Sequence, residues 1–194
     1  MDAYSALLQY FNNFLPLTKD EEVFIRQIFI EKPVKKRTQI LKPGEVSQLN
    51  SFVVEGCFKM YLMDPSGKAH NLQFAIENWW IGDIGSFHAE TPSRLYIEAM
   101  EDSLLLQVSK NDQLELFTRF PKFNQIFRVF TENALVAAQR RILQNIGSTA
   151  EERYLDFAQR YPQLFNRISN VQIASYLGVT PEFLSTIRKR IVQK

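Results

Sequence analysis

Residues 168–190 read ISNVQIASYLGVTPEFLSTIRKR, and this stretch fits two short helices joined by a tight turn. Ser169 and Gln172 form an S-x-x-Q capping box, which predicts that a helix begins at Asn170. Gly178 stands where the chain must leave that helix through a left-handed residue, which glycine adopts without a steric penalty. The first half of the stretch therefore predicts a capped helix that ends in a sharp turn.

A second helix is predicted directly after the turn. Thr180 can cap it, and Pro181 suits its first position, where no backbone N–H is needed. Leu184 and Ile187 supply its buried stripe, and the small Ala174 of the first helix allows the two helices to cross closely. Together the two halves predict a helix-turn-helix.

The outward side of the second helix has the chemistry of a DNA-reading helix. Polar side chains can bond to base edges in the major groove, and cations bind backbone phosphates. The predicted DNA-binding residues are Thr180, Glu182, Ser185, Thr186, Arg188, Lys189 and Arg190. The residues from Ala150 onward include seven Lys and Arg but only four acids, whereas the net charge of the whole chain is only +2. An ordinary surface hairpin of two helices is the alternative interpretation.

Composition limits the class of protein. The chain has 194 residues, 45% of them hydrophobic and 23% charged, which is typical of a globular protein. Cys57 is the only cysteine, so a disulfide within the chain and a cysteine-ligated zinc or iron–sulfur site are excluded, and a buried thiol is expected. No apolar run is long enough to span a bilayer, and the first residues lack signal-peptide features, so a cytoplasmic location is expected.

No arrangement of residues predicts an enzyme. The acids show no pairing that indicates a cleft, and Ser, His and Asp form no ordered set. Neither a Walker loop nor an H-E-x-x-H motif is present. We therefore expect a non-enzymatic protein without a metal site.

The first part of the chain is predicted to be helical, over about Asp2–Ile30. Leu15-Pro16 interrupts the helical pattern, and Thr18-Lys19-Asp20-Glu21 is a capping box that opens a second helix. From Lys35 to about Val108 the pattern changes to short strands with Pro and Gly turns, which indicates an antiparallel sandwich or barrel. The predicted strands are Lys36–Leu41, Ser51–Val54, Phe58–Met63, Leu72–Ile76, Leu95–Ala99 and Leu104–Val108.

Ser109-Lys110-Asn111-Asp112 predicts a helix start, and a long helix follows from Pro121 to about Gly147. Its residues Phe123, Phe127, Phe130, Ala134 and Ala137 alternate at spacings of four and three, which is the pattern of a coiled-coil seam. The same pattern fits packing inside one chain. We favour a dimer seam because helix-turn-helix proteins generally act as symmetric pairs on half-sites about 34 Å apart.

After Gly147, overlapping capping boxes at Ser148–Glu151 and Thr149–Glu152 predict a helix over Ala150–Tyr161, which Tyr161-Pro162 ends. The helix-turn-helix then completes a small three-helix domain. The predicted domains are a sensor barrel with N-terminal helices over 1–120, a dimerisation helix over 121–147 and a DNA-binding domain over 148–194.

This order of elements resembles the Crp/Fnr family of bacterial transcription regulators over about Lys35–Arg190. The resemblance rests on the helix-turn-helix and on four further pieces: Leu41–Glu45, Phe52–Gly56, Asp64–Lys68, and Ile81–Gly85 with Arg94 and Ala99 after it. It implies an α+β fold with an antiparallel double-stranded β-helix (jelly-roll) barrel. The ending at Lys194, with no β-hairpin wing, is similar to a subgroup frequent in Bacteroidetes.

The resemblance also implies an effector site in the barrel. In the family, a Gly-Glu pair and a later Arg-Ser pair hold a cyclic nucleotide, since an anion needs a cation and N–H donors. The matching ligand-binding residues are Gly82, Asp83, Ile84, Ser93 and Arg94. The acid is one methylene shorter and the second pair is reversed, which argues against cyclic AMP itself. Because neighbouring strand residues face opposite sides, Arg94 is expected to point away from the phosphate.

Two other patterns have structural interpretations. Trp79 and Trp80 are expected to pack in the core or at its rim. His70 and His88 are isolated in the sequence and do not predict a haem site.

The sequence therefore predicts a homodimeric transcription regulator that binds double-stranded DNA. Three alternatives are open for the barrel: a cyclic nucleotide, another small anionic effector, or no ligand; no other cofactor is expected. The family resemblance adds RNA polymerase as a partner, and no membrane is expected. The alternative is a small-molecule sensor whose helical tail contacts a protein rather than DNA.

Overall fold

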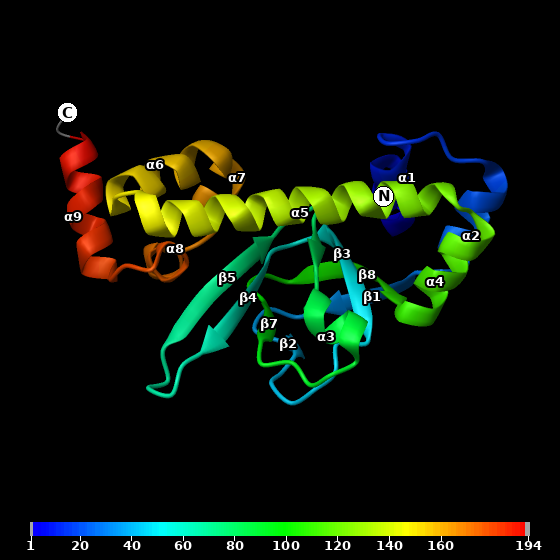
Figure 1. Ribbon diagram of the computed structural model, residues 1–194, viewed down its shortest axis with the longest axis horizontal. Coiled ribbons are helices and arrows are strands. Elements are labelled where there is room, and N and C mark those ends of the chain that lie inside the picture. Colours follow the sequence, from blue (N-terminus) through cyan, green and yellow to red (C-terminus); the bar gives the residue numbers. More distant parts are fainter. Residues whose placement is uncertain (1, 193–194) are drawn as a thin grey trace. The chain divides into compact units, whose positions relative to one another are not determined.

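Figure 1 shows the computed structural model of the chain, which describes residues 2–192. Its contacts divide the chain into two compact units, 1–63 with 72–130 and 64–71 with 131–194. The division falls inside the long helix α5 (Lys122–Gly147), so this helix contributes residues to both units.

Two short helices, α1 (Ala3–Asn12) and α2 (Lys19–Ile28), begin the first unit. The capping box predicted for the second helix is confirmed in both directions. The backbone N–H of Thr18 donates to Glu21 Oε2 at 2.7 Å, and the N–H of Glu21 donates to Thr18 Oγ1 at 3.4 Å. These bonds satisfy donors that a helix start leaves without partners.

Antiparallel strands follow in two four-stranded sheets, one in the order β1-β8-β3-β6 and the other in the order β2-β7-β4-β5. This is the double-stranded β-helix, or jelly-roll, that the sequence predicted (Figure 1). The strands are β1 (Ile30–Val34), β2 (Gln39–Leu41), β3 (Leu49–Glu55), β4 (Phe58–Met63), β5 (Ala69–Ala75), β6 (Trp80–Ile81), β7 (Tyr96–Ala99) and β8 (Ser103–Ser109).

The barrel has apolar residues on both faces of its first sheet. Val53 and Leu105 belong to the core cluster that also contains Phe58 and Ile97 of the other sheet. Their chain neighbours Phe52 and Leu106 belong to a second cluster. Adjacent strand residues face opposite sides, so this sheet separates two cores.

The second core is largely aromatic. It lies between the first sheet and the helices that cover that sheet. Phe11 of α1 and Phe123 of α5 are fully buried in it, with ring centroids 5.3 Å apart. Trp80 packs there as expected, 5.4 Å from Phe52, and Trp79 packs against the barrel core. Cys57 is also fully buried, as predicted.

Two strands and one helix of the first unit were not predicted: β1, β6 and α3 (Ile84–Ala89). Ile30 was expected to end a helix, but it begins β1 and pairs with Gln107. Four of the five β1 residues are exposed, and Pro33 lies in this edge strand. A strand that buries one side chain has no hydrophobic alternation for the sequence to show.

Helix α4 (Lys110–Arg119) begins as predicted, because the N–H of Asp112 donates to Ser109 Oγ at 3.1 Å. The expected dimer seam on α5 is wrong for its phenylalanines. Phe123 is buried within the chain, and Phe127 and Phe130 pack against the same aromatic core. For these three residues the 4-3 spacing marks an intrachain face, which was the alternative interpretation, whereas Ala134 and Ala137 are exposed.

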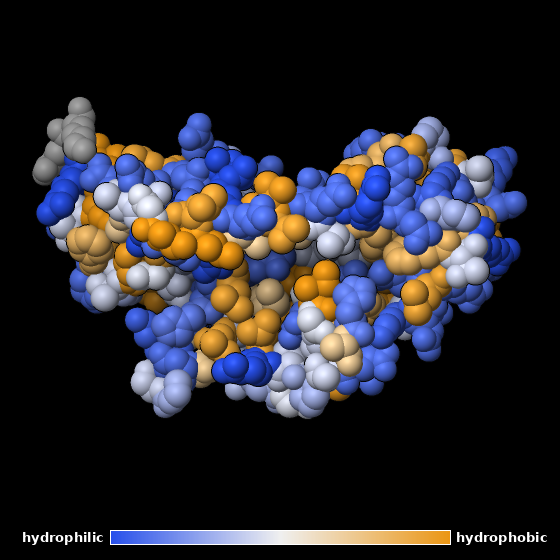
Figure 2. All heavy atoms as spheres, in the orientation of Figure 1, coloured by the Kyte–Doolittle hydropathy of each residue, from blue (hydrophilic) through white to orange (hydrophobic). Residues whose placement is uncertain are grey.

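A different side of α5 is apolar and exposed. Figure 2 shows hydrophobic residues gathered over the C-terminal half of this helix. The exposed apolar side chains there are Leu135, Val136, Ile142, Leu143 and Ile146, and Ile146 is 80% exposed. About 3.6 residues form each helical turn, so Leu135, Ile142 and Ile146 share one stripe, with Val136 and Leu143 along its edge. We name these five residues the α5 apolar face.

The second unit contains α6 (Ala150–Arg160), α7 (Pro162–Phe165), α8 (Asn170–Leu177) and α9 (Pro181–Val192). The capping box at Thr149 and Glu152 is confirmed in both directions. The short α7 was not predicted. It begins at Pro162, where the helix predicted over Ala150–Tyr161 was expected to stop. No helix of the described residues is both long enough and apolar enough to cross a membrane.

Candidate nucleic-acid interface and effector site

Helices α8 and α9, with the turn between them, form the helix-turn-helix that the sequence predicted. Ser169 Oγ accepts a hydrogen bond from the N–H of Gln172 at 3.4 Å, so α8 begins at Asn170. Gly178 has φ +70° and ends α8, and the N–H of Val179 donates to Ala174 O at 3.0 Å. The glycine lets the chain reverse its direction within a few residues.

The second helix is fixed by its own cap and by its buried stripe. Thr180 Oγ1 accepts from the N–H of Phe183 at 3.2 Å, as the sequence predicted. Leu184 and Ile187 are buried, as is Ala174 of α8, and the two helices pack against each other. This packing determines which side of α9 faces outward.

Five of the predicted contact residues lie on that outward side. Their side chains are exposed: Glu182, Ser185, Thr186, Lys189 and Arg190. Ser185 Oγ donates to Pro181 O at 3.0 Å, and Thr186 Oγ1 donates to Glu182 O at 3.1 Å. Each hydroxyl oxygen still has a lone pair that can accept from a base. Phe183 is also exposed beside them, and no contact role was predicted for it.

Arg188 is less exposed than these five residues and has contacts within the chain. Its Nη1 donates to Asn170 Oδ1, and its guanidinium lies 5.7 Å from the ring centroid of Phe165. Arg188 therefore ties α9 to the start of α8 and to α7. A cation on an aromatic face stabilises the domain itself, in addition to any contact with a phosphate.

The five residues expected to hold an effector lie around the start of α3. Asp83 caps this helix, and its Oδ1 accepts from the N–H groups of Gly85 and Ser86, each at 3.1 Å. Its Oδ2 accepts from Ser93 Oγ at 2.7 Å. The Asp83 carboxylate therefore already accepts from the N–H donors and the hydroxyl that an incoming phosphate would need.

The other members of this set are separated by burial. Ser93 is buried, whereas Arg94 and Ile84 are exposed, and Gly82 lies in the turn before Asp83. Neighbouring residues 93 and 94 thus face opposite sides. Arg94 is exposed and the N–H donors are already bonded to Asp83, so this arrangement differs from a cluster that neutralises a cyclic phosphate.

Residues 31–120 match the model of the cyclic nucleotide-binding domain family.

The curated proteins that this chain is similar to are named as regulators. The chain is 27% identical to electron transport regulator A of Shewanella oneidensis over 82% of its length and 68% of that protein. It is 25% identical to the "Probable transcriptional regulator flp" of Lacticaseibacillus casei, over 98% of this chain and 87% of that protein. A solved structure of a regulator assigned to the crp/fnr family, from Eubacterium rectale, superimposes with a TM-score of 0.71 at 17% identity, over 95% and 88%. Neither an enzyme nor a protein-binding tail is favoured by these names.

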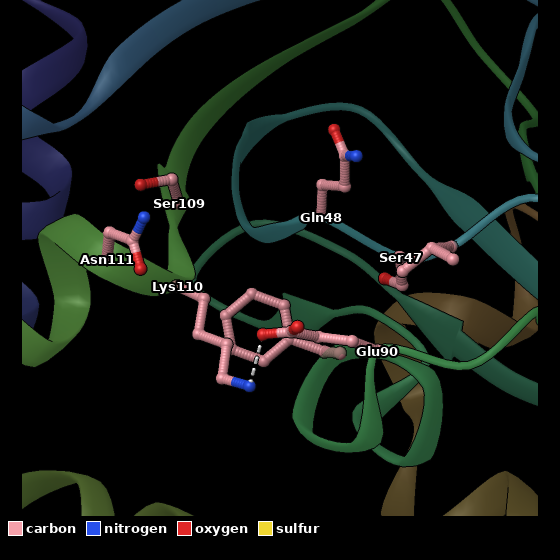
Figure 3. Close-up of a pocket in the computed structure, with 8 residues that line it drawn as sticks. Ser47, Gln48, Glu90, Ser109, Lys110 and Asn111 are labelled. Atoms are coloured by element: carbon pink, nitrogen blue, oxygen red, sulfur yellow. Dashed lines mark hydrogen bonds and ion pairs between the residues drawn. The ribbon is translucent and has the colours of Figure 1, made fainter.

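Beside helix α3 lies a hollow of about 400 Å³ (Figure 3). It is lined by Val46, Ser47, Gln48, Phe87, Glu90, Ser109, Lys110 and Asn111. The ammonium of Lys110 points to Glu90 Oε1 at 2.6 Å, and this bond lowers the pKa of the Glu90 carboxyl. The single cation and the single acid neutralise each other, so this hollow offers no net positive charge to an anionic effector.

His70 is isolated in the sequence, but in the structure it has an acidic partner. It lies in β5, and its Nε2 is 2.7 Å from Asp64 Oδ2. His88 is exposed at the end of α3. Sequence reasoning also missed the α5 apolar face, which a repeat of seven residues from Leu135 to Ile142 could have indicated.

Proposed function

We propose that this chain is a homodimeric transcription regulator of the Crp/Fnr type that binds specific DNA sequences. The observation that carries the proposal is the exposed polar side of α9, presented by a capped helix-turn-helix. The barrel's match to the cyclic nucleotide-binding domain family and the names of the curated relatives support it. RNA polymerase is included as a partner on the family resemblance alone.

The roles of the α9 residues follow from their chemistry. Glu182, Ser185 and Thr186 contact base edges, because they can bond directionally to groove atoms. Lys189 and Arg190 contact phosphates, which fixes the position of the helix on the duplex without reading sequence. Arg188 adds a phosphate contact from its place beside Phe165.

The dimer is proposed to form through the α5 apolar face. Apolar side chains of this size are seldom exposed together on a helix unless another surface covers them. A second copy of the same helix covers them symmetrically and places two recognition helices on neighbouring half-sites.

The barrel is proposed to bind a small effector other than cyclic AMP. The internal bonds of Asp83 support this, because a phosphate there would meet a carboxylate instead of free N–H donors. A thermal-shift screen with cyclic AMP, cyclic GMP and small anionic metabolites tests it. Stabilisation by cyclic AMP that exceeds stabilisation by every other compound would contradict this part of the proposal.

DNA binding is tested by selecting duplexes from a random pool and measuring affinity by fluorescence anisotropy. We expect a selected motif with two half-sites and an affinity that falls steeply between 50 and 200 mM salt, by about 10³-fold or more for six phosphate contacts. No measurable binding at 50 mM salt would overturn the proposal.

The Glu182→Ala variant tests direct readout in the same selection. Removing one base-contacting side chain is expected to relax preference at one base-pair position in each half-site, with other positions unchanged. An unchanged motif would exclude Glu182 from base recognition.

A further inference from the structure

A narrow cleft in the second unit is lined by an unusual number of arginines. It lies between α5, α6 and α8, and its floor contains the aromatic side chains of Phe157, Tyr161 and Tyr176. The charged residues that line it are Arg140, Arg141, Arg153, Arg160 and Asp156. We name this feature the arginine cleft.

Positive charge exceeds negative charge in the arginine cleft. Four guanidinium groups line it with one carboxylate, and that carboxylate, Asp156, already accepts from Arg160 Nε at 2.6 Å. Like charges brought together beside an apolar floor repel more strongly than they would in water. The lining residues alone therefore leave an excess of about three positive charges.

Two of the arginines, Arg141 and Arg153, donate to backbone carbonyl oxygens. Arg141 donates to Tyr176 O at 3.0 Å, and its guanidinium lies 4.2 Å from the ring centroid of Tyr176. Arg153 Nη1 donates to Ser148 O at 2.7 Å, while its buried Nε has no hydrogen-bond partner among the described residues. Burial lowers the pKa of Arg141, which shows that its surroundings disfavour the charged form.

The cleft is on the side of α5 opposite to the α5 apolar face. Arg140, Arg141 and Gln144 line it, and at about 3.6 residues per turn they lie roughly half a turn away from Leu135, Ile142 and Ile146. A second chain packed on the apolar face would therefore leave the arginine cleft open, and it would not supply the missing negative charge.

We propose that the arginine cleft binds a single phosphoryl-type oxyanion. The planar fork of a guanidinium matches two oxygens of a phosphate, and four such groups supply both donors and charge. The free space is about 20 Å³, which is room for about one water-sized group and excludes a nucleoside. Arg140 and Arg160 are exposed, so their side chains can move to admit a tetrahedral ion. The oxyanion belongs to a free phosphate compound or to a backbone phosphate of DNA.

Inorganic phosphate is the probe that tests the site. The melting temperature of the full chain is measured against phosphate concentration, with chloride at matched ionic strength as the reference. We expect phosphate to raise the melting temperature by about 3–6 °C at ten times its dissociation constant. The double variant Arg140→Gln/Arg160→Gln should lose this rise, and ³¹P line broadening should disappear with it.

Two single variants locate the bound anion. Arg37→Gln removes an exposed arginine of the first unit and should keep the full phosphate effect. Arg94→Gln removes the exposed arginine of the predicted effector set. If Arg94→Gln abolishes the effect while the double variant keeps it, or if phosphate stabilises no more than chloride, the proposal is wrong.

A labelled duplex distinguishes the two sources of the oxyanion. If a DNA phosphate fills the cleft, free phosphate competes with the duplex, and the double variant lowers the slope of log affinity against log salt by about 2. If a free phosphate compound fills it, the slope is unchanged while the thermal effect remains. Because the phosphate measurements use no DNA, failure to bind any duplex would overturn the proposed function without affecting this site.

Discussion

At the scale of single residues, Gly56 shows how one backbone position limits the barrel. Its φ is +102°, and a Cβ built on it would lie 2.0 Å from Ser103 Oγ and 2.8 Å from Ser103 Cα. The second contact is with backbone, which cannot rotate away. Gly67, in contrast, has φ +81° and open space around the same position.

We therefore expect Gly56→Ala to destabilise the chain much more than Gly67→Ala. The Gly67 variant carries only the left-handed strain of about 1–2 kcal/mol, whereas the Gly56 variant adds an overlap that costs about 1–3 kcal/mol more. Urea unfolding followed by circular dichroism measures both. Equal losses of stability would show that β8 shifts freely to accommodate the methyl group.

Glu21 is a buried acid with a defined partner. Its Oε2 lies 2.5 Å from the ammonium of Lys122, and its side chain is 7% exposed. Burial by itself would raise the pKa of Glu21, but the Lys122 and Thr18 hydrogen bonds outweigh it, so the pKa is below the ordinary value of 4.5. A lowered pKa means that the charged form is favoured in the folded chain.

Glu21→Gln is accordingly expected to cost about 1–3 kcal/mol of stability at pH 7. The contribution of Glu21 is complete above about pH 4.5, the ordinary pKa of a glutamate, and it is lost as the pH falls through the lowered pKa. The difference between wild type and variant should therefore shrink on acidification below pH 4.5. A difference that stays constant from pH 7 to pH 3 would contradict this account.

At the scale of elements, local signals predicted helix starts well. The capping boxes at Thr18 and Thr149 and the left-handed Gly178 were correct because the bonds involved join residues three or four apart. Strands β1 and β6 were missed because pairing with distant strands holds them, and their own side chains show no alternation.

Side-chain roles were harder to predict than the elements that carry them. The spacing of Phe127 and Phe130 identified an apolar face of α5 but could not show whether the same chain or a second copy covers it. The direction of Arg188 depends on Phe165, which a sequence cannot place beside it. The bond between Ser93 and Asp83 likewise forms only once β7 and α3 are brought together by the barrel.

Helix α5 gives the element-scale prediction. Ile142→Glu combined with Ile146→Glu places two charges on the α5 apolar face and should convert a dimer to a folded monomer, because burying unpaired carboxylates at an interface is costly. Gel filtration with light scattering at micromolar concentration measures this. Leu114→Glu, at an exposed leucine of α4, should remain dimeric, and a monomeric wild type would remove the proposed interface altogether.

At the scale of the whole molecule, charge is unevenly distributed. The chain carries +2 in total, and residues from 150 onward carry seven basic side chains against four acids. The outward side of α9 presents part of this charge to solvent. Long-range attraction to a duplex would therefore act mainly on the second unit and would weaken with salt.

Lys189 and Arg188 separate this electrostatic contribution from the stability of the domain. Lys189→Ala removes an exposed cation and should lower the salt slope of DNA binding by about 1 without changing the melting temperature.

Arg188→Ala should weaken binding to all sequences similarly and also lower stability by about 1 kcal/mol, because it breaks the bond to Asn170 and the contact with Phe165. Anisotropy at several salt concentrations and thermal unfolding of the same samples separate the two effects. If Arg188→Ala melted like wild type, its intrachain contacts would be dispensable, and a sequence-selective loss of affinity would exclude the phosphate role. The basic residues of α9 thus divide according to the side of the helix they occupy, since only those facing outward can act on DNA without altering the fold.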